Sequence, residues 1–304
     1  MTTRLSTRQM QMMVAIADAG SISDAAVQLG LTQSALSHRL KEAERLLGAL
    51  LFTRGQRRLN PTSAGKRLLH AARGVLAELE RAEQDIQRLA VGVEQVVRVG
   101  VEACGGYHWL PTALAAFNRS HPHIGVEIVP DVSLEPCRAL RRGHVDLALV
   151  AGSHPPIGFD TTVLKHDELR LAVRHDHSLA RQAWVGAEDV AAEPYVAYHT
   201  TPEKGREYEQ LFSPAGVLPA RVISAGVTEA VLSLVRHGLG VSVLPAWTLE
   251  PHLTTGDLAS LRLTEQGLYL NWYLVMRQGE AEGSAAEALA HTLQAVITGR
   301  RECE

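Results

Sequence analysis

The chain has few cysteines and few aromatic residues, and it contains no long apolar run. Its three cysteines, Cys104, Cys137 and Cys303, lie far apart and form no CxxC motif, so we expect reduced thiols in a reducing compartment. No stretch reaches the roughly 18 apolar residues that a membrane-spanning helix needs. The first 20 residues include Arg, Asp and Gln, which is typical of an amphipathic helix and not of a signal peptide. We therefore expect a cytoplasmic, globular protein.

Catalytic motifs are missing as well. The sequence has no GxSxG, no HExxH and no P-loop, and the Gly-Leu-Gly sequence at 238–240 lacks the third glycine of a dinucleotide loop. The His-x-His pairs at 121–123 and 175–177 could bind a metal, but no third and fourth ligands follow at a recognisable spacing. The sequence therefore predicts no catalytic residue, no metal site and no cofactor, and we expect that the protein is not an enzyme.

Charge is distributed unevenly along the chain. Residues 1–74 hold 11 Lys and Arg against 4 Asp and Glu, a net charge of +7, whereas residues 75–304 hold 19 against 29, a net charge of −10. A basic N-terminal part on an acidic body is typical of a nucleic-acid-binding module attached to another domain.

Residues 23–61 have the pattern of a winged helix-turn-helix. Ser23 is a suitable N-cap for a first helix with apolar Ala26, Val27 and Leu29, and the sequence Gly-Leu-Thr at 30–32 provides a turn and a second cap. The second helix ends at Gly48. Its apolar residues recur at helical spacing and predict one buried stripe; they are Leu36, Leu40, Ala43 and Leu47.

The polar residues of this second helix suit contact with DNA bases. Short hydrogen-bonding side chains near the start of a recognition helix can approach base edges in the major groove. The candidates are Gln33, Ser34, Ser37, His38 and Lys41. Residues 49–53 and 57–60 predict a basic hairpin, or wing, around residues 54–56. Its candidate phosphate contacts are Arg54, Arg57, Arg58 and Thr62. The alternative is an amphipathic helix pair that binds no DNA.

Two further helices frame this region. Residues 6–19, capped by Ser6 or Thr7, predict a first helix that buries Met10, Met13, Val14 and Ile16. Residues 63–90 predict a long helix in which apolar residues alternate at spacings of four and three, as in a coiled coil. This apolar seam consists of Leu68, Ala72, Val75, Leu79, Ala82, Ile86 and Leu89. The seam predicts a dimerisation helix; the alternative is a helix packed on its own domain.

After a hinge at 90–94 the pattern changes to alternating strands and helices, which favours parallel sheets and two subdomains. The nearly continuous apolar strand at 146–150 suggests a central, parallel position. Other strands are expected at 96–101, 124–129, 169–173, 195–198, 222–224, 241–243 and 272–276. Helices are expected at 109–119, 136–142, 203–213, 227–237 and 284–298.

The N-terminal motifs resemble those of the LysR-type transcriptional regulators. The resemblance rests on the sequence AVQLGLTQSALSHRL at 26–40, ERLLG at 44–48, LFTR at 51–54, Pro61-Thr62 and Gly65. His38 departs from the arginine that is most common at this place. Segments at 101–102, 109–110, 132–136, 146–147, 170–171, 213–217, 244–247 and 267–268 are similar to the methionine-biosynthesis subgroup of that family.

The resemblance implies an α/β fold with an N-terminal winged helix-turn-helix domain (1–62), a linker helix (63–90) and an effector domain (91–304). The effector domain is expected to resemble a periplasmic binding protein, with lobe one at about 94–162 plus 267–304 and lobe two at about 163–266. Ligands bind at the carboxyl ends of parallel strands. The candidate effector residues are Glu102, Ala103, Cys104, Val132, Ser133, Gly152, Ser153, His199, Thr200, Gly226 and Thr228.

The resemblance also implies an activator of methionine-biosynthesis genes with homocysteine as coeffector. Its expected partners are a double-stranded operator with an inverted repeat, RNA polymerase, and further copies of itself in a dimer or tetramer. Three alternatives stay open: a different small carboxylate, oxidation of Cys104 or Cys137, or a plain small-molecule binding protein. Glu102 could hold a ligand amine or bridge the two lobes.

Overall fold

The computed structural model describes residues 4–54, 58–90, 94–105, 107–279 and 283–299. The chain divides into two compact units between residues 91 and 92. Within the described ranges, every helix is too short or too polar to cross a lipid bilayer.

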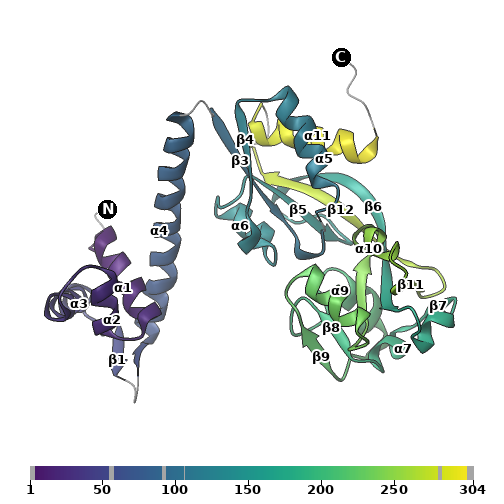
Figure 1. The fold of residues 1–304 in the computed structure, drawn as a ribbon, viewed down its shortest axis with the longest axis horizontal. Coiled ribbons are helices and arrows are strands. Elements are labelled where there is room, and N and C mark those ends of the chain that lie inside the picture. Colours follow the sequence, from purple (N-terminus) through teal and green to yellow (C-terminus); the bar gives the residue numbers. More distant parts are fainter. Residues whose placement is uncertain (1–3, 55–57, 91–93, 106, 280–282, 300–304) are drawn as a thin grey trace. The chain divides into compact units, whose positions relative to one another are not determined.

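The N-terminal unit is a winged helix-turn-helix followed by a long helix (Figure 1). Its elements are α1 (Thr7–Ala19), α2 (Ile22–Gln28), α3 (Gln33–Leu47), β1 (Phe52–Arg54), β2 (Leu59–Pro61) and α4 (Ser63–Ala90). Ser6 caps α1 through a capping box with Gln9, and the Thr32 hydroxyl accepts a hydrogen bond from Ala35 N at 3.3 Å at the start of α3. The core of this unit includes Met12, Met13, Ile16, Leu36, Leu40 and Ala43.

The start of α2 differs from the sequence prediction. Ser21 caps this helix, not Ser23, because α1 ends at the left-handed Gly20 and the extended backbone of Ser21 places its hydroxyl 3.1 Å from Asp24 N. The helix therefore begins at Ile22 and buries Ala25 and Ala26. Val27 was expected to be apolar support for the helix, but 80 % of its surface is exposed.

Helix α4 packs on the N-terminal unit only along its first turns. Leu69 packs in the core of this unit and Ala72 is buried, whereas the seam residues Val75, Leu79 and Ile86 are 42 %, 43 % and 65 % exposed. The apolar seam therefore continues beyond the part of the helix that the rest of the N-terminal unit covers. A seam of this kind needs a second helix to bury it.

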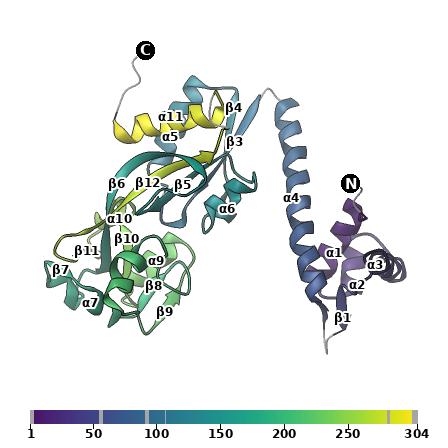
Figure 2. The same cartoon turned by 180° about the vertical axis from the view of Figure 1, so that it is seen from behind.

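The second unit is an α/β domain with two lobes (Figures 1 and 2). Its strands are β3 (Gln95–Val101), β4 (Ile124–Ile128), β5 (Leu147–Gly152), β6 (Phe159–Arg174), β7 (Trp184–Val185), β8 (Tyr195–Ala197), β9 (Val222–Ser224), β10 (Ser242–Pro245), β11 (Leu258–Leu263) and β12 (Leu268–Arg277). Its α-helices are α5 (Leu110–Ser120), α6 (Pro136–Arg141), α7 (Ala187–Ala191), α8 (Ser213–Ala215), α9 (Thr228–Arg236), α10 (Ala246–Leu253) and α11 (Ala285–Thr298). Short 3-10 turns include η1 (Ala103–Gly105) and η2 (Pro130–Val132), and residues Tyr208–Phe212 form a π-helical turn.

The main sheet is mixed, and not parallel as the alternation of strands and helices suggested. Its order is β4-β3-β5-β12-β6-β11-β7, with β10 also paired to β6. Strand β3 is parallel to β4 and β5, but β12 and β6 join them as an antiparallel pair. The mixture arises because the chain passes between the lobes twice, in opposite directions.

Strands β6 and β12 connect the two lobes. The first residues of β6 pair with the end of β12, whereas its last residues, Leu169–Arg174, pair with β10 and β11. Strand β5 has the central position predicted for it. Leu147 and Leu149 face the core beneath α5 and α11, whereas Ala148 and Val150 face α6 on the other side.

Several elements were missed or misjudged from the sequence. Strand β6 begins ten residues before the predicted start, and β7, β11, α7 and α10 were not predicted. The predicted helix at 203–213 is replaced by the π-helical turn and α8. Their positions depend on contacts with the second lobe, which local sequence patterns do not reveal.

Candidate DNA-binding surface and effector site

The exposed side of α3 carries the predicted base-reading residues. Gln33, Ser34, His38 and Lys41 are exposed, whereas Ser37 is half-buried. Leu36, Leu40 and Ala43 fix the opposite side of the helix in the core. The N-terminal end of α3 therefore presents a row of polar side chains on a rigidly packed helix, as major-groove recognition requires.

The wing follows α3 directly. Arg54 ends β1, the exposed Arg58 precedes β2, and the predicted contact Arg57 lies outside the described residues. The stem of Arg58 passes close to Gly20, whose carbonyl accepts a hydrogen bond from Leu59 N at 2.9 Å. Thr62 differs from the arginines, because its hydroxyl donates to Leu50 O at 2.7 Å and accepts from Gly65 N at 3.0 Å. That hydroxyl is thus already paired within the domain.

In the second unit, the first group of predicted effector residues lies in the turn that follows β3. Glu102 N donates to Leu149 O and Ala103 N donates to Ser133 O, both at 2.9 Å. One carboxylate oxygen of Glu102 accepts a hydrogen bond from Ala151 N at 2.6 Å. These bonds fix η1 at the carboxyl end of β3, where the sheet of lobe one meets lobe two.

Lobe two holds this turn through three side chains. The Thr228 hydroxyl donates to Ala103 O, the Thr248 hydroxyl donates to Cys104 O, and the Arg206 guanidinium donates to Cys104 Sγ. Tyr198 OH lies 3.0 Å from Thr228 Oγ1 and extends the network. The segment at 103–104 is therefore one place where the two lobes touch through polar groups.

A buried charge cluster surrounds Arg206. The residue is 4 % exposed, and its guanidinium lies 3.8 Å from carboxylate oxygens of both Glu203 and Glu207. Glu207 also accepts hydrogen bonds from Tyr195 OH at 3.0 Å and from Glu203 N at 2.9 Å. Glu102 adds a third carboxyl group to the electrostatic environment of Arg206.

Burial changes the ionisation of this cluster. It raises the pKa of Glu102, of Glu203 and, strongly, of Cys104, with the positive charge of Arg206 opposing each shift. Burial acts in the opposite direction on the pKa of Arg206, but the acidic groups around it outweigh burial and raise that pKa. At neutral pH the Cys104 thiol is therefore protonated beside a permanently charged guanidinium.

A pocket of about 400 Å³ opens beside this cluster on lobe one. Glu102, Cys137, Arg138, Arg141 and Ala151 are among the residues that line it. Glu102 thus belongs both to the pocket wall and to the charge cluster between the lobes, which makes it the link between a solvent-accessible cavity and Arg206.

The other predicted effector residues are distributed unevenly around this centre. Ser153 joins the lobe contact, with N and Oγ donating to Gly205 O at 3.1 and 3.2 Å, and His199 lies 3.8 Å from Glu203. Three residues make no such contact. Val132 packs against the apolar core near α6, Thr200 is exposed, and a Cβ atom added at Gly226 would meet open space.

Two family models match this chain. The model for the LysR substrate binding domain matches residues 90–298, and the model for bacterial regulatory helix-turn-helix proteins of the lysR family matches residues 7–66. The chain belongs to the LysR family. It is a LysR-type DNA-binding transcriptional regulator with an effector-binding domain, and the predicted family and fold class are confirmed.

Relatives of this LysR-type regulator cover nearly its whole length. The transcriptional regulator MetR of Haemophilus influenzae is 29 % identical over 295 residues, covering 96 % of this chain and 94 % of MetR. The regulator CbbR of Rhodospirillum rubrum is 28 % identical, covering 95 % of each chain. The structure of full-length CbnR in complex with its target DNA matches with a TM-score of 0.70 and 24 % identity, covering 97 % of this chain and 99 % of CbnR. The named relatives are transcriptional regulators, in agreement with the expectation that the chain is not an enzyme.

The residue at the centre of the buried charge cluster, Arg206, was not among the predicted site residues of this LysR-type regulator. Arg206 stands in the sequence Glu-Lys-Gly-Arg-Glu at 203–207, and a charge run of this kind usually marks a solvated surface. Its burial follows from the long-range contact with Cys104, 102 residues earlier in the chain. In the described ranges, no three His, Cys, Asp or Glu side chains lie close enough together to hold a metal ion.

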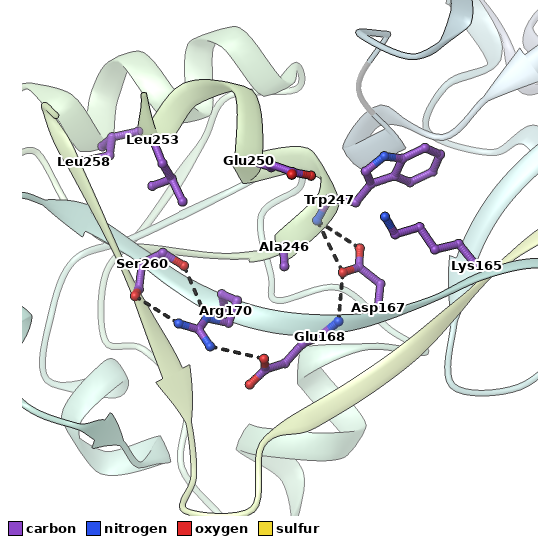
Figure 3. Close-up of a pocket in the computed structure, with 10 residues that line it drawn as sticks. All are labelled: Lys165, Asp167, Glu168, Arg170, Ala246, Trp247, Glu250, Leu253, Leu258 and Ser260. Carbon is purple, nitrogen blue, oxygen red and sulfur yellow. Dashed lines mark hydrogen bonds and ion pairs between the residues drawn. The ribbon is translucent and has the colours of Figure 1, made fainter. Parts of the chain in front are cut away.

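A second pocket, of about 670 Å³, lies beside the crossing strand β6 (Figure 3). Here Asp167 accepts hydrogen bonds from Trp247 N at 3.1 Å and from Trp272 Nε1 at 2.9 Å, which fixes the start of α10. Arg170 reaches Glu168 and Ser260, and Lys165 lies over the Trp247 ring at 5.1 Å. None of the predicted effector residues lines this pocket, and its interactions stabilise the junction between the lobes.

We expect the Glu102→Gln variant to reveal the pH dependence of the lobe contact. Burial raises the pKa of Glu102 above its ordinary value of 4.5, so the folded protein holds this proton more tightly than the unfolded chain. The resulting stability is fully present below pH 4.5 and is lost as pH rises through the raised pKa. The stability of the variant relative to the wild type should therefore increase as pH rises above 4.5, as measured by thermal unfolding. Glutamine can still accept the hydrogen bond from Ala151 N.

The exposed Glu265 provides a matched control. Glu265→Gln removes the same charge from the same unit and should show no comparable divergence from the wild type over this pH range. A constant offset between Glu102→Gln and the wild type at every pH would contradict a raised pKa at Glu102.

Proposed function

We propose that this LysR-type regulator activates methionine-biosynthesis genes and that homocysteine is its effector. The observation that carries the proposal is the row of exposed polar side chains on α3, in a chain whose full-length relatives include proteins named MetR. As a DNA-binding protein it would act in the cytoplasm, at operators with two similar half-sites.

DNA recognition in this proposal divides between two surfaces. Gln33, Ser34 and His38 contact base edges from the first turns of α3, where side chains can approach the major groove most closely. The arginines of the wing contact phosphates, which adds affinity without sequence preference. Dimerisation through the seam of α4 would place two such surfaces on successive half-sites, and pairs of dimers would form a tetramer that RNA polymerase meets at the promoter.

The effector acts through the contact between the lobes. The turn at 103–104 is held by Thr228, Thr248 and Arg206, so a ligand that enters here must alter how the lobes meet. A ligand shifts this equilibrium only to the extent that it binds one arrangement of the lobes more tightly than the other. Homocysteine carries both a carboxylate and an ammonium group, which suits a site with a buried guanidinium and three carboxyl groups.

The test is DNA binding by the full chain to the control regions of methionine-biosynthesis genes, with and without homocysteine. Gln33→Ala should reduce the preference for the operator over scrambled DNA by ~10–100-fold, because a lost base contact removes roughly 1–3 kcal/mol of discrimination. Arg58→Ala should instead weaken binding to both DNAs equally and reduce the salt dependence by about one unit of slope. Gln11→Ala, at an exposed glutamine of α1, is the matched control.

A uniform loss over all sequences for Gln33→Ala would move Gln33 to the phosphate contacts. Failure of the wild type to bind any of these control regions would refute the assignment to methionine biosynthesis. Unchanged binding and transcription on addition of homocysteine would refute homocysteine as the effector.

Regulation by thiol oxidation receives less support. The reactive form of cysteine is the thiolate, and burial raises the pKa of Cys104 strongly and that of Cys137 to about 11. Both thiols are therefore protonated at neutral pH, and Cys104 is fully buried. These properties favour a ligand-responsive regulator over a peroxide-responsive one.

A further inference from the structure

The guanidinium of Arg206 lacks the partners that a buried arginine normally has. Its Nε is buried without a hydrogen-bond acceptor, and one carboxylate oxygen each of Glu203 and Glu207 is buried without a donor. Both glutamates lie 3.8 Å from the guanidinium, too far for hydrogen bonds. Buried polar atoms that lack a hydrogen-bond partner are costly, so an arrangement of this kind indicates groups placed for a ligand.

Among the described residues, the Arg206 guanidinium donates one hydrogen bond, which goes to Cys104 Sγ. A thiol sulfur is a weak acceptor, whereas a carboxylate can accept two parallel N–H bonds from a guanidinium. A ligand carboxylate that took the place of Cys104 Sγ as the hydrogen-bond acceptor would therefore bind Arg206 more strongly than the thiol does. The same exchange would release the contact between Arg206 in lobe two and Cys104 in lobe one.

The surplus of acidic groups around Arg206 indicates which class of carboxylate ligand would fit. Arg206 is surrounded by Glu102, Glu203 and Glu207, so a plain carboxylate would neutralise the cation and leave three carboxyl groups beside it. A zwitterion supplies an ammonium group for these carboxylates as well as a carboxylate for the guanidinium. We propose that Arg206 binds the α-carboxylate of an amino-acid effector, and that Glu203 and Glu207 bind its ammonium group.

This inference rests on the proposed function in requiring an effector between the lobes, but it does not require homocysteine. The experiment is a thermal-shift screen of the full chain with homocysteine and the twenty standard amino acids, followed by calorimetric titration of the tightest binder. That amino acid is then compared with its decarboxylated amine and its deaminated acid. We expect each truncated ligand to bind at least tenfold more weakly than the intact amino acid.

Two variants test which protein group binds which group of the ligand. Arg206→Lys keeps the positive charge but loses the planar guanidinium, which can donate two parallel hydrogen bonds to a carboxylate. It should weaken binding of the amino acid at least tenfold while leaving binding of the decarboxylated amine unchanged. Glu203→Gln should weaken binding of the amino acid but not of the deaminated acid. Arg221→Lys, at an exposed arginine of the same lobe, should change neither. If Arg206 had a purely structural role, Arg206→Lys would weaken the binding of all three ligands equally.

The outcomes separate the two proposals. Binding of another amino acid but not of homocysteine would refute the proposed effector and support the assignment of Arg206. The assignment is overturned if no amino acid binds, if a deaminated acid binds as tightly as the intact ligand, or if Arg206→Lys binds like the wild type. The DNA-binding measurements above stand apart from each of these results.

Discussion

The Leu79→Asp variant is expected to be monomeric and to lose most of its affinity for an operator. Leu79 lies in the middle of the α4 seam and is 43 % exposed in the single chain, where Val75 and Ile86 continue the same apolar stripe. In a two-fold dimer the substitution would bury two unpaired carboxylates between apolar side chains. We therefore expect dimer dissociation to increase by about a thousandfold or more, as measured by sedimentation equilibrium.

The effect on DNA follows from the coupling of two half-sites. Two linked binding surfaces gain about 10²–10⁴-fold in affinity over one, and a monomer forfeits that gain. Operator binding by Leu79→Asp should fall by a comparable factor in a gel shift, while binding to an isolated half-site should stay the same. Gln84→Asp places an equal charge on the same helix away from the seam and should leave both the dimer and its operator affinity intact. A dimeric Leu79→Asp protein would show that another surface holds the copies together.

The N-terminal unit was predictable because its determinants are local. The caps at Ser6 and Thr32, the left-handed Gly48 and the stripe of Leu36, Leu40 and Ala43 all lie within a few residues of the structure that they specify. The wrong N-cap predicted for α2 is also a local error, because Ser21 and Ser23 are both serines and either could cap the helix. The choice between them depends on where α1 ends, which Gly20 sets.

The effector site was predictable only in part. The turn after β3 could be located because a strand followed by Glu102 and Cys104 places polar groups at a sheet edge. Its partners Arg206 and Thr248 are more than 100 residues away, in elements whose local sequence gives no sign of burial. The mixed sheet was missed for a related reason, because strand direction is set by the two crossings between lobes and not by the pattern within β6 or β12.

The second large effect is expected at Gly65, which lies in the first turn of α4. A Cβ atom at this position would overlap the carbonyl oxygen of Leu51 and would lie 3.1 Å from its carbonyl carbon. That carbonyl cannot move away easily, because it accepts the hydrogen bond from Thr62 N at 2.9 Å that joins the wing to α4. Gly65→Ala should therefore destabilise the N-terminal unit by roughly 3 kcal/mol and abolish operator binding near its lowered unfolding temperature.

Gly74 provides a matched control for Gly65, because it lies in the same helix and a Cβ atom added there would meet open space. Alanine at this position removes the conformational cost of glycine in a helix, so Gly74→Ala should stabilise the N-terminal unit by up to about 1 kcal/mol. The same substitution is thus expected to have opposite signs at two positions of one helix, as measured by thermal unfolding of the full chain. Equal shifts for both variants would mean that the approach of α4 to Leu51 is looser than the structure indicates, and that the wing is not held by this contact.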